Sequence, residues 1–241
     1  MTTSTTVTDL EITLAGRALL QGVDLSIAAG ERVALMGASG SGKTLLTAAL
    51  LGTLPPSAVV SGRIEIAGTG DPRQRDAVVA GVQQDSSTAL NPLVRVGAHV
   101  ARPFRAAGSS RLAARREAAT VLAALDLDAD RVLDAWPAEL SGGQRQRVCI
   151  AVALACRADL VIADEPTTAL DVVSQARVVE AIATACDRTG AGLLFVTHDR
   201  DVAEQLCTRA VVLDAGRVVD RFVFSSTERP LAPHATESTA A

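Results

Sequence analysis

Short apolar runs alternate with segments of helical periodicity along most of the chain. Five of the runs are almost continuously apolar, which is typical of strands buried on both faces of a parallel sheet. Three earlier segments alternate between apolar and polar residues, which favours antiparallel strands with one solvated face. The parallel candidates are residues 32–36, 78–82, 160–163, 193–196 and 211–213, and the alternating candidates are residues 10–14, 23–28 and 62–66. The pattern predicts an α/β fold with an antiparallel β flank.

Strand patterns are missing between residues 91 and 154, where Ala, Leu and Arg dominate. Ser109 and Ser110 are candidate N-caps for a helix over residues 111–125, with apolar positions such as Leu112 and Leu122 at helical spacing. We therefore expect one α/β core from residues 1–90 and 155–224, interrupted by a helical subdomain at 91–154. Residues 225–241 are Ser, Thr, Pro and Ala without periodicity, and they predict a flexible C-terminal tail.

Charge and composition narrow the class of protein. The 241 residues include 23 Lys or Arg against 27 Asp or Glu, a formal net charge of −4, so no basic excess favours nucleic acid as a partner. The longest apolar stretch, residues 148–156, is too short to cross a bilayer. The four cysteines include no Cys-x-x-Cys pair and lie among Ala, Val and Leu, so we expect buried thiols and a reducing cytoplasm. All but one of the 23 cationic residues are arginine, and the exception is Lys43.

A glycine-rich segment follows the candidate strand at 32–36 and precedes a helical pattern. This segment is Gly37, Ala38, Ser39, Gly40, Ser41, Gly42, Lys43 and Thr44, which matches the P-loop pattern. Its glycines let backbone N–H groups converge on phosphate oxygens at a helix N-terminus. We predict that Lys43 reaches the β and γ phosphates of ATP and that the Thr44 hydroxyl binds Mg²⁺. The alternative is a chance glycine-rich turn, which the flanking strand and helix make less frequent.

Two carboxylates follow the buried run at 160–163. Ligands bind at the carboxyl ends of strands in open α/β sheets, so Asp164 and Glu165 should face the P-loop. Asp164 is predicted to hold Mg²⁺, and Glu165 to point at the water that attacks the γ-phosphate. The alternative is a solvated strand end before Pro166.

Polar residues also follow two further candidate strands. His198 comes after residues 193–196, and Gln84 comes after residues 78–82. We predict that His198 donates to a γ-phosphate oxygen, and that Gln84 orients the water or completes the Mg²⁺ shell. A lone histidine is more often structural, and His99 and His234 are expected on the surface.

A second candidate anion site has a serine and two glycines at the start of a helix. It comprises Leu140, Ser141, Gly142, Gly143 and Gln144, and it would be an ordinary capped helix if taken alone. Together with the other motifs, however, the chain resembles an ATP-binding-cassette (ABC) ATPase from Leu10 to about Phe224. The resemblance identifies Walker A at 37–44, the Q-loop residue Gln84, the signature at 140–144, Walker B at 160–165, the D-loop at 169–171 and the switch residue His198.

This resemblance implies a P-loop NTPase (RecA-like) core with an inserted helical subdomain. It also implies head-to-tail dimers in which Ser141, Gly142, Gly143 and Gln144 contact an ATP held by the partner's P-loop. The expected partners are a second, different ABC ATPase subunit, two transmembrane permeases and an extracytoplasmic substrate-binding protein, at the cytoplasmic face of the cell membrane. Coupling helices of the permeases would dock where the Q-loop meets the helical subdomain.

Finer motifs, such as the segments 84–92 and 163–173, resemble the peptide and nickel importers among ABC ATPases. Two residues depart from the family pattern: Leu14 replaces the usual adenine-stacking aromatic residue, and Ser86 replaces a common proline. Weaker contact with adenine is the expected consequence. Three alternatives stay open at this point: a soluble ABC ATPase in repair or translation, an exporter cassette, and a small-molecule kinase, which would leave residues 141–144 without a role.

Overall fold

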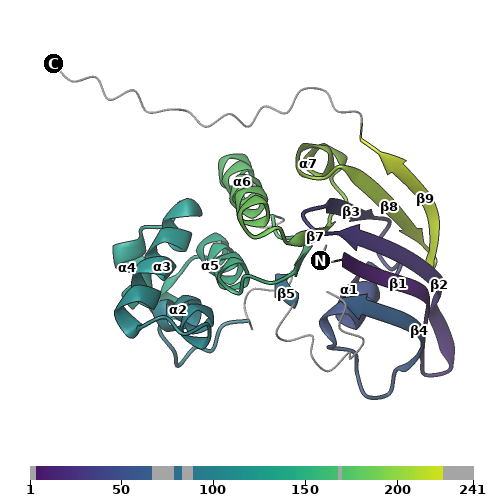
Figure 1. Cartoon of the computed structure of the whole chain (residues 1–241), viewed down its shortest axis with the longest axis horizontal. Coiled ribbons are helices and arrows are strands. Elements are labelled where there is room, and N and C mark those ends of the chain that lie inside the picture. The colour runs from purple at the N-terminus through teal and green to yellow at the C-terminus, as the bar shows by residue number, and fades with distance from the viewer. Residues whose placement is uncertain (1–3, 67–78, 83–88, 168–169, 225–241) are drawn as a thin grey trace.

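The computed structural model describes residues 4–66, 79–82, 89–167 and 170–224. Two sheets lie next to each other on one side of the molecule, and a group of helices extends from them on the other side (Figure 1). Gln84, Ser86, Ala169, His234 and the tail 225–241 lie outside the described residues. The interpretations that rest on those residues stay predictions.

The N-terminal part of the chain forms an antiparallel sheet of three strands in the order β2-β1-β4. Val7, in β1, pairs with Leu25 on one side and with Ile64 on the other. The predicted antiparallel flank is confirmed, and its strands are longer than the alternating segments alone indicated. The strands are β1 (Ser4–Leu14), β2 (Arg17–Ala28) and β4 (Val59–Ile66).

The second sheet has six strands in the order β5-β6-β7-β3-β8-β9. The first five are parallel to one another, and β9 pairs with β8 in the antiparallel sense. All five predicted parallel strands are present, whereas β9 was not predicted. The strands are β3 (Arg32–Met36), β5 (Val79–Val82), β6 (Leu160–Asp164), β7 (Gly192–Val196), β8 (Arg209–Asp214) and β9 (Arg217–Val223).

The parallel strands separate two apolar cores. Val33 and Leu35 of β3 belong to a core shared with the antiparallel sheet and with helix α1, which contributes Leu46. Ala34, between them, belongs to a second core with the remaining helices. Strands β3, β6 and β7 are thus buried on both faces, which explains why their sequences are almost continuously apolar, whereas Gly81 of the edge strand β5 is exposed.

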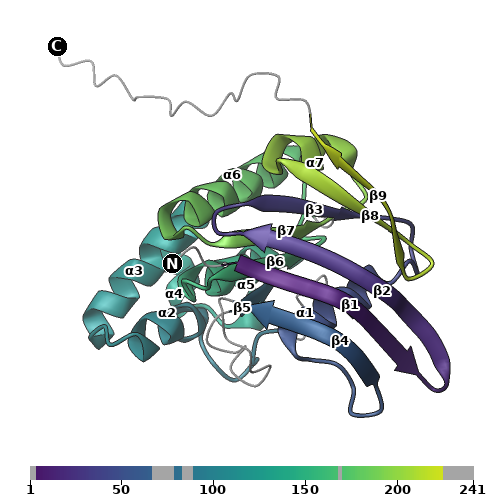
Figure 2. The same ribbon diagram turned by 45° about the vertical axis from the view of Figure 1, so that its right-hand side comes forward.

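Seven α-helices and a short 3₁₀ helix are described. Helices α2, α3 and α4 lie together at one end of the molecule (Figure 2), on the side away from the antiparallel sheet (Figure 1). Helices α5, α6 and α7 pack on the face of the parallel strands opposite α1. No described helix is long and apolar enough to cross a membrane. The helices are α1 (Lys43–Leu51), α2 (Val96–Ala106), α3 (Arg111–Ala124), α4 (Ala129–Asp134), η2 (Pro137–Glu139), α5 (Gly142–Ala155), α6 (Val172–Thr189) and α7 (Arg200–Leu206).

Helix α3 begins as predicted, and Leu122 is buried as expected, but Leu112 is not. The side chain of Ser110 caps it by accepting a hydrogen bond from the Ala113 N–H (3.2 Å). The buried residues Ala114, Ala118 and Leu122 follow one another every four positions. Leu112 lies on a different face of the helix from Ala114 and is 61% exposed, so its predicted place on the apolar face is wrong.

Three of the four cysteines are buried, as predicted, and Cys156 is exposed, which corrects the expectation for that residue. Burial raises the pKa of Cys149 and Cys186 to about 11 and that of Cys207 to about 12. These three thiols therefore stay protonated near neutral pH and act as small apolar side chains.

Candidate active site

The turn between β3 and α1 has the backbone of a phosphate-binding loop. Gly37 has a φ of +147°, and a Cβ atom there would lie 2.1 Å from the carbonyl oxygen of Leu213. Gly42 has a φ of +108°, and its Cβ would lie 2.6 Å from the Leu20 side chain. Only glycine fits these two positions. Both glycines are required because neighbouring atoms approach the backbone too closely for a side chain and because φ is positive.

The polar groups of this loop are available for an anion. The Lys43 ammonium donates to the carbonyl oxygens of Gly37 (2.8 Å) and Ala38 (2.9 Å), which places the charge inside the loop. The N-cap residue Gly42 offers no side-chain oxygen to the first N–H groups of α1. Ser41 Oγ is buried and has no hydrogen-bond partner among the described residues. The N–H groups at the start of α1, the buried Ser41 hydroxyl and the Lys43 ammonium all donate hydrogen bonds, and such donors fit the phosphates of a nucleotide.

The strand β6 delivers two carboxylates to the same edge of the sheet. Asp164 is its last residue and Glu165 follows it, with the Glu165 N–H donating to the carbonyl oxygen of Val196 on β7 (3.0 Å). Burial raises the pKa of Asp164, and the neighbouring Glu165 carboxylate raises it further, while the Lys43 ammonium and a hydrogen bond from Thr47 act in the opposite direction. Asp164 is in register with Val196 of β7, and Val196 is in register with Leu35 of β3, so Asp164 lies at the edge of the sheet where the P-loop begins.

His198 lies at the end of the neighbouring strand, as predicted. Its Nδ1 is 3.2 Å from Glu165 Oε1, so the imidazole and the carboxylate form a hydrogen-bonded pair. The Glu165 side chain is 18% exposed and that of His198 is 69% exposed. The carboxylate is therefore sheltered beside an imidazole that solvent can reach.

Glu165 has a backbone conformation that is uncommon for a residue with a side chain. Its φ is +45°, in the left-handed region, and Pro166 follows it. Such conformations persist only where the surrounding structure holds them, and they are frequent at functional sites.

The predicted signature residues form the start of α5. Ser141 is the N-cap: the Gln144 N–H donates to Ser141 Oγ (3.2 Å), and the Ser141 N–H donates to Gln144 Oε1 (3.0 Å). Gly142 opens the helix, and a Cβ there would meet nothing within 4 Å, so the surface above it is open. Helices α5 and α1 pack on opposite faces of the parallel strands. The two candidate anion sites, at the P-loop and at the start of α5, therefore lie on helices from different faces of the sheet.

No role was predicted for Gln146, which lies five residues after Ser141. Its side chain is 2% exposed, and its Nε2 donates to the carbonyl oxygen of Pro166 (2.6 Å). The sequence offers no signal for this contact beyond the position of Gln146 two residues after the predicted signature.

Two other predicted positions have an observed place. Leu14, expected in place of an aromatic residue, is half-buried at the end of β1, where it pairs with Arg17. His99 is half-buried rather than on the surface, and its Nε2 lies 3.1 Å from the carbonyl oxygen of Asn91.

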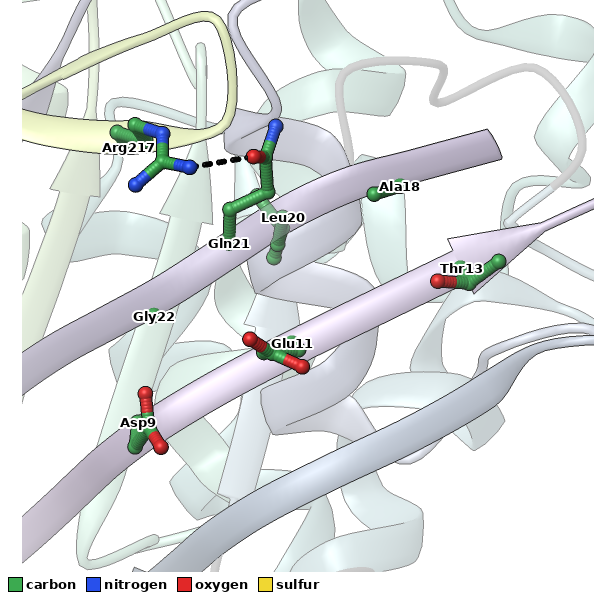
Figure 3. Close-up of a pocket in the computed structure, with 8 residues that line it drawn as sticks. All are labelled: Asp9, Glu11, Thr13, Ala18, Leu20, Gln21, Gly22 and Arg217. Carbon is green, nitrogen blue, oxygen red and sulfur yellow. Dashed lines mark hydrogen bonds between the residues drawn. The ribbon is translucent and has the colours of Figure 1, made fainter. Parts of the chain in front are cut away.

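A polar hollow of about 320 Å³ lies elsewhere, on the antiparallel sheet (Figure 3). The carboxylates of Asp9 and Glu11 line it, and Arg217 donates to Gln21 Oε1 (2.6 Å) at its rim. None of the predicted site residues lines this hollow, so the candidate active site is the convergence of strand ends around Lys43.

Comparisons with known proteins agree with this arrangement. A family model described as ABC transporter matches residues 20–168. The oligopeptide transport ATP-binding protein OppD of Mycobacterium tuberculosis is 40% identical over 229 residues, which cover 89% of this chain and 37% of OppD. The nickel import ATP-binding protein NikE of Escherichia coli is 40% identical over 221 residues, 87% of this chain and 82% of NikE.

A solved dimer of an ATP-binding cassette, in a post-hydrolysis state with ADP and Pi, has a TM-score of 0.79. It is 27% identical, and the match covers 92% of this chain and 99% of that one. The chain therefore spans nearly all of a cassette but little more than a third of the length of OppD. It belongs to the ABC transporter family.

Proposed function

We propose that this member of the ABC transporter family is the ATP-binding and ATP-hydrolysing subunit of an importer for nickel or peptides. The proposal is supported by one observation: Lys43, Asp164, Glu165 and His198 all lie at or after the carboxyl ends of neighbouring parallel strands. An ammonium in a glycine-rich loop and a sheltered carboxylate beside it are what phosphoryl transfer to water requires.

ATP binding falls to the P-loop, residues 37–44. Its backbone N–H groups and the Ser41 hydroxyl would donate to phosphate oxygens, and Lys43 would exchange its two carbonyl partners for the β and γ phosphates. Thr44 and Asp164, with Gln84, would hold Mg²⁺, which neutralises phosphate charge when it is bound.

Hydrolysis needs a base beside the γ-phosphate. Glu165 would accept a proton from water as the water oxygen bonds to the γ-phosphorus and the bond to the ADP oxygen breaks. His198 would donate to a γ-phosphate oxygen, and its contact with Glu165 Oε1 would hold the two side chains side by side.

The signature residues would act on a second nucleotide. Ser141, Gly142, Gly143 and Gln144 form a helix start whose outer surface is open, and α5 lies on the face of the sheet opposite α1. This supports a head-to-tail dimer in which the N-terminus of α5 in one cassette contacts the ATP in the P-loop of the other.

The relatives named for nickel import and oligopeptide transport support the choice of cargo class. We extend the proposal to the assembly: a second ATPase subunit, two permeases and an extracytoplasmic binding protein, with this chain at the cytoplasmic face of the membrane.

Two variants test the hydrolytic site. Lys43→Ala should lower kcat for ATP hydrolysis about 100-fold or more, because the negative charge of the transferred phosphate is no longer stabilised by the lysine ammonium. Glu165→Gln should lower kcat by about 10²- to 10⁴-fold while ATP stays bound and favours the closed dimer. Phosphate release and gel filtration with ATP measure both effects.

Glu204→Gln is the matched control, since it makes the same chemical change at an exposed position of α7. Its turnover should equal that of the unchanged protein. Undiminished turnover in Glu165→Gln would contradict the assignment of the base.

Purification of the chain with its bound proteins separates the remaining alternatives. An importer subunit should copurify with a polytopic permease and respond to a loaded binding protein. Association with ribosomes or DNA would indicate a soluble repair or translation ATPase, and a phosphorylated small molecule in place of free phosphate would indicate a kinase.

A further inference from the structure

A buried amide links the signature helix to the turn that carries Glu165. Gln146 lies in the second turn of α5, and its Nε2 is 2.6 Å from the carbonyl oxygen of Pro166. A carbonyl oxygen accepts only, so the amide must present its N–H to Pro166. The other amide atom, Oε1, is buried without a hydrogen-bond partner among the described residues.

Hydrogen bonds hold this turn on both sides of Glu165. Glu165 is in the left-handed region at a φ of +45°, which a side-chain-bearing residue leaves unless neighbours hold it. Before the turn, the Glu165 N–H is tied to Val196. After it, the Pro166 nitrogen has no hydrogen to donate, and the Pro166 carbonyl is tied to Gln146. The two contacts therefore bracket the residue proposed as the base.

The same helix carries the signature. Ser141 and Gln146 are five residues apart, which is about 7.5 Å along a helix axis. Capping by Ser141 and packing of Val148 and Ile150 in the core make this segment a stiff unit. A displacement of its N-terminus on a phosphate would therefore be carried to Gln146, and from Gln146 to Pro166.

Packing alone does not require a glutamine at position 146. Gln146 Oε1 has no partner among the residues that the structure describes, and a buried amide oxygen of that kind destabilises the folded protein, whereas an apolar side chain of similar volume would avoid that cost. The position nevertheless keeps a group that can donate to one particular carbonyl oxygen.

We infer that Gln146 is a positioning residue that holds the Glu165–Pro166 backbone and ties it to the signature helix of the same chain. The inference rests on the proposed function, because it assigns the orientation of the hydrolytic base. Contact of the signature with the partner's ATP would in this way set the geometry of Glu165 in the chain's own site, so the two sites of a dimer are coupled through one hydrogen bond.

Gln146→Met tests the inference, because methionine keeps the length and most of the volume but cannot donate. We expect kcat to fall roughly 10- to 100-fold, as misplacement of a reacting group by about 1 Å does, with KM and the affinity for ATP within about twofold of the unchanged protein. Steady-state phosphate release and titration with a fluorescent ATP analogue measure these values.

Two controls separate positioning from loss of stability. Ile150→Val also removes packing atoms from buried α5, and should lower the melting temperature without changing kcat. Asp126→Ala removes another link, in which Arg177 of α6 contacts Asp126 beside α3 (2.7 Å), and should likewise leave kcat unchanged. A tenfold loss of kcat in either control would show general loosening and overturn the specific role of Gln146.

Each result has a defined meaning. Normal kcat in folded Gln146→Met overturns the inference, and so does a fall in ATP affinity that accounts for the whole loss of turnover. If circular dichroism shows Gln146→Met to be unfolded, Gln146→Glu is tested by the same criterion, because glutamate keeps the length and shape and puts an acceptor against the Pro166 carbonyl. If that variant is unfolded as well, the contact is a folding determinant and the inference fails. Absence of ATP hydrolysis by the unchanged protein would instead count against the proposed function.

Discussion

Lys43 is the one lysine among 23 cationic residues, and its ammonium lies inside the P-loop, where it donates to the carbonyl oxygens of Gly37 and Ala38. Arginine would not fit that position, because its planar fork is broader than a single ammonium group. The site therefore depends on the shape of this side chain as well as on its charge.

An amine-directed acylating reagent has two kinds of target in the chain, the N-terminal amine and Lys43. We expect saturating ATP to block acylation of Lys43, because the ammonium then donates hydrogen bonds to phosphate oxygens and is shielded from the reagent. Mass spectrometry of the peptides gives the extent of modification. The N-terminal amine is the control within the same sample, and equal labelling of Lys43 with and without ATP would refute the placement of the phosphates.

Individual residues also show how far the sequence alone could lead. Lys43, Asp164 and His198 were predicted correctly to share one edge of the sheet, because each follows a buried parallel strand. Gln146 could not be found in that way. Its partner, Pro166, is twenty positions away in the sequence, and which side of a helix faces a given turn is decided by packing between elements.

At the scale of elements, the turn between β2 and β3 is joined to β8 by an ion pair. Arg209 Nε donates to Glu31 Oε1 (2.6 Å), and Glu31 Oε2 accepts from the Ala28 N–H (2.8 Å). Burial by itself would raise the pKa of Glu31, but the Arg209 hydrogen bond, with the Ala28 N–H, holds it below its ordinary value. The pair thus stabilises the folded state when Glu31 is ionised.

Glu31→Gln should lower the melting temperature at pH 7 by a few degrees, equivalent to about 1 kcal/mol. Because the pKa of Glu31 is lower in the folded protein, this contribution is complete above the ordinary Glu pKa and disappears as the pH falls through the folded value. The difference between variant and parent should therefore shrink in acid. Glu180→Gln, at an exposed site on α6, is the control, and a pH-independent difference would exclude the ion pair as its cause.

Elements differ in how clearly their sequences predict them. The parallel strands were predicted because burial on both faces makes them continuously apolar. Strand β9 was missed, since Asp220 and Arg221 interrupt its valines and most of its side chains are exposed at the sheet edge. The polar residues of an edge strand are compatible with a loop as well, and only pairing with β8 distinguishes the two.

At the scale of the whole molecule, the site is assembled from distant parts of the sequence. Strand β3 lies between β7 and β8, and β6 lies beyond β7, so the P-loop, Glu165 and His198 meet only when the sheet is complete. ATP that binds this arrangement and not the unfolded chain would stabilise the entire fold, by about 2.7 kcal/mol at 100 times Kd. Binding of ATP would therefore stabilise both cores together with the site.

The position of Lys43 at the first turn of α1 also makes the loop accessible to a protease assay. An endoprotease that cuts only after lysine can cleave the chain at one bond, between Lys43 and Thr44, giving fragments of 43 and 241 − 43 = 198 residues. Cleavage requires this turn to open, so its rate measures local unfolding of the phosphate loop in the native protein. ATP should slow the cut, which gel electrophoresis can follow, whereas an equal rate at saturating ATP would mean that the nucleotide does not hold this turn closed.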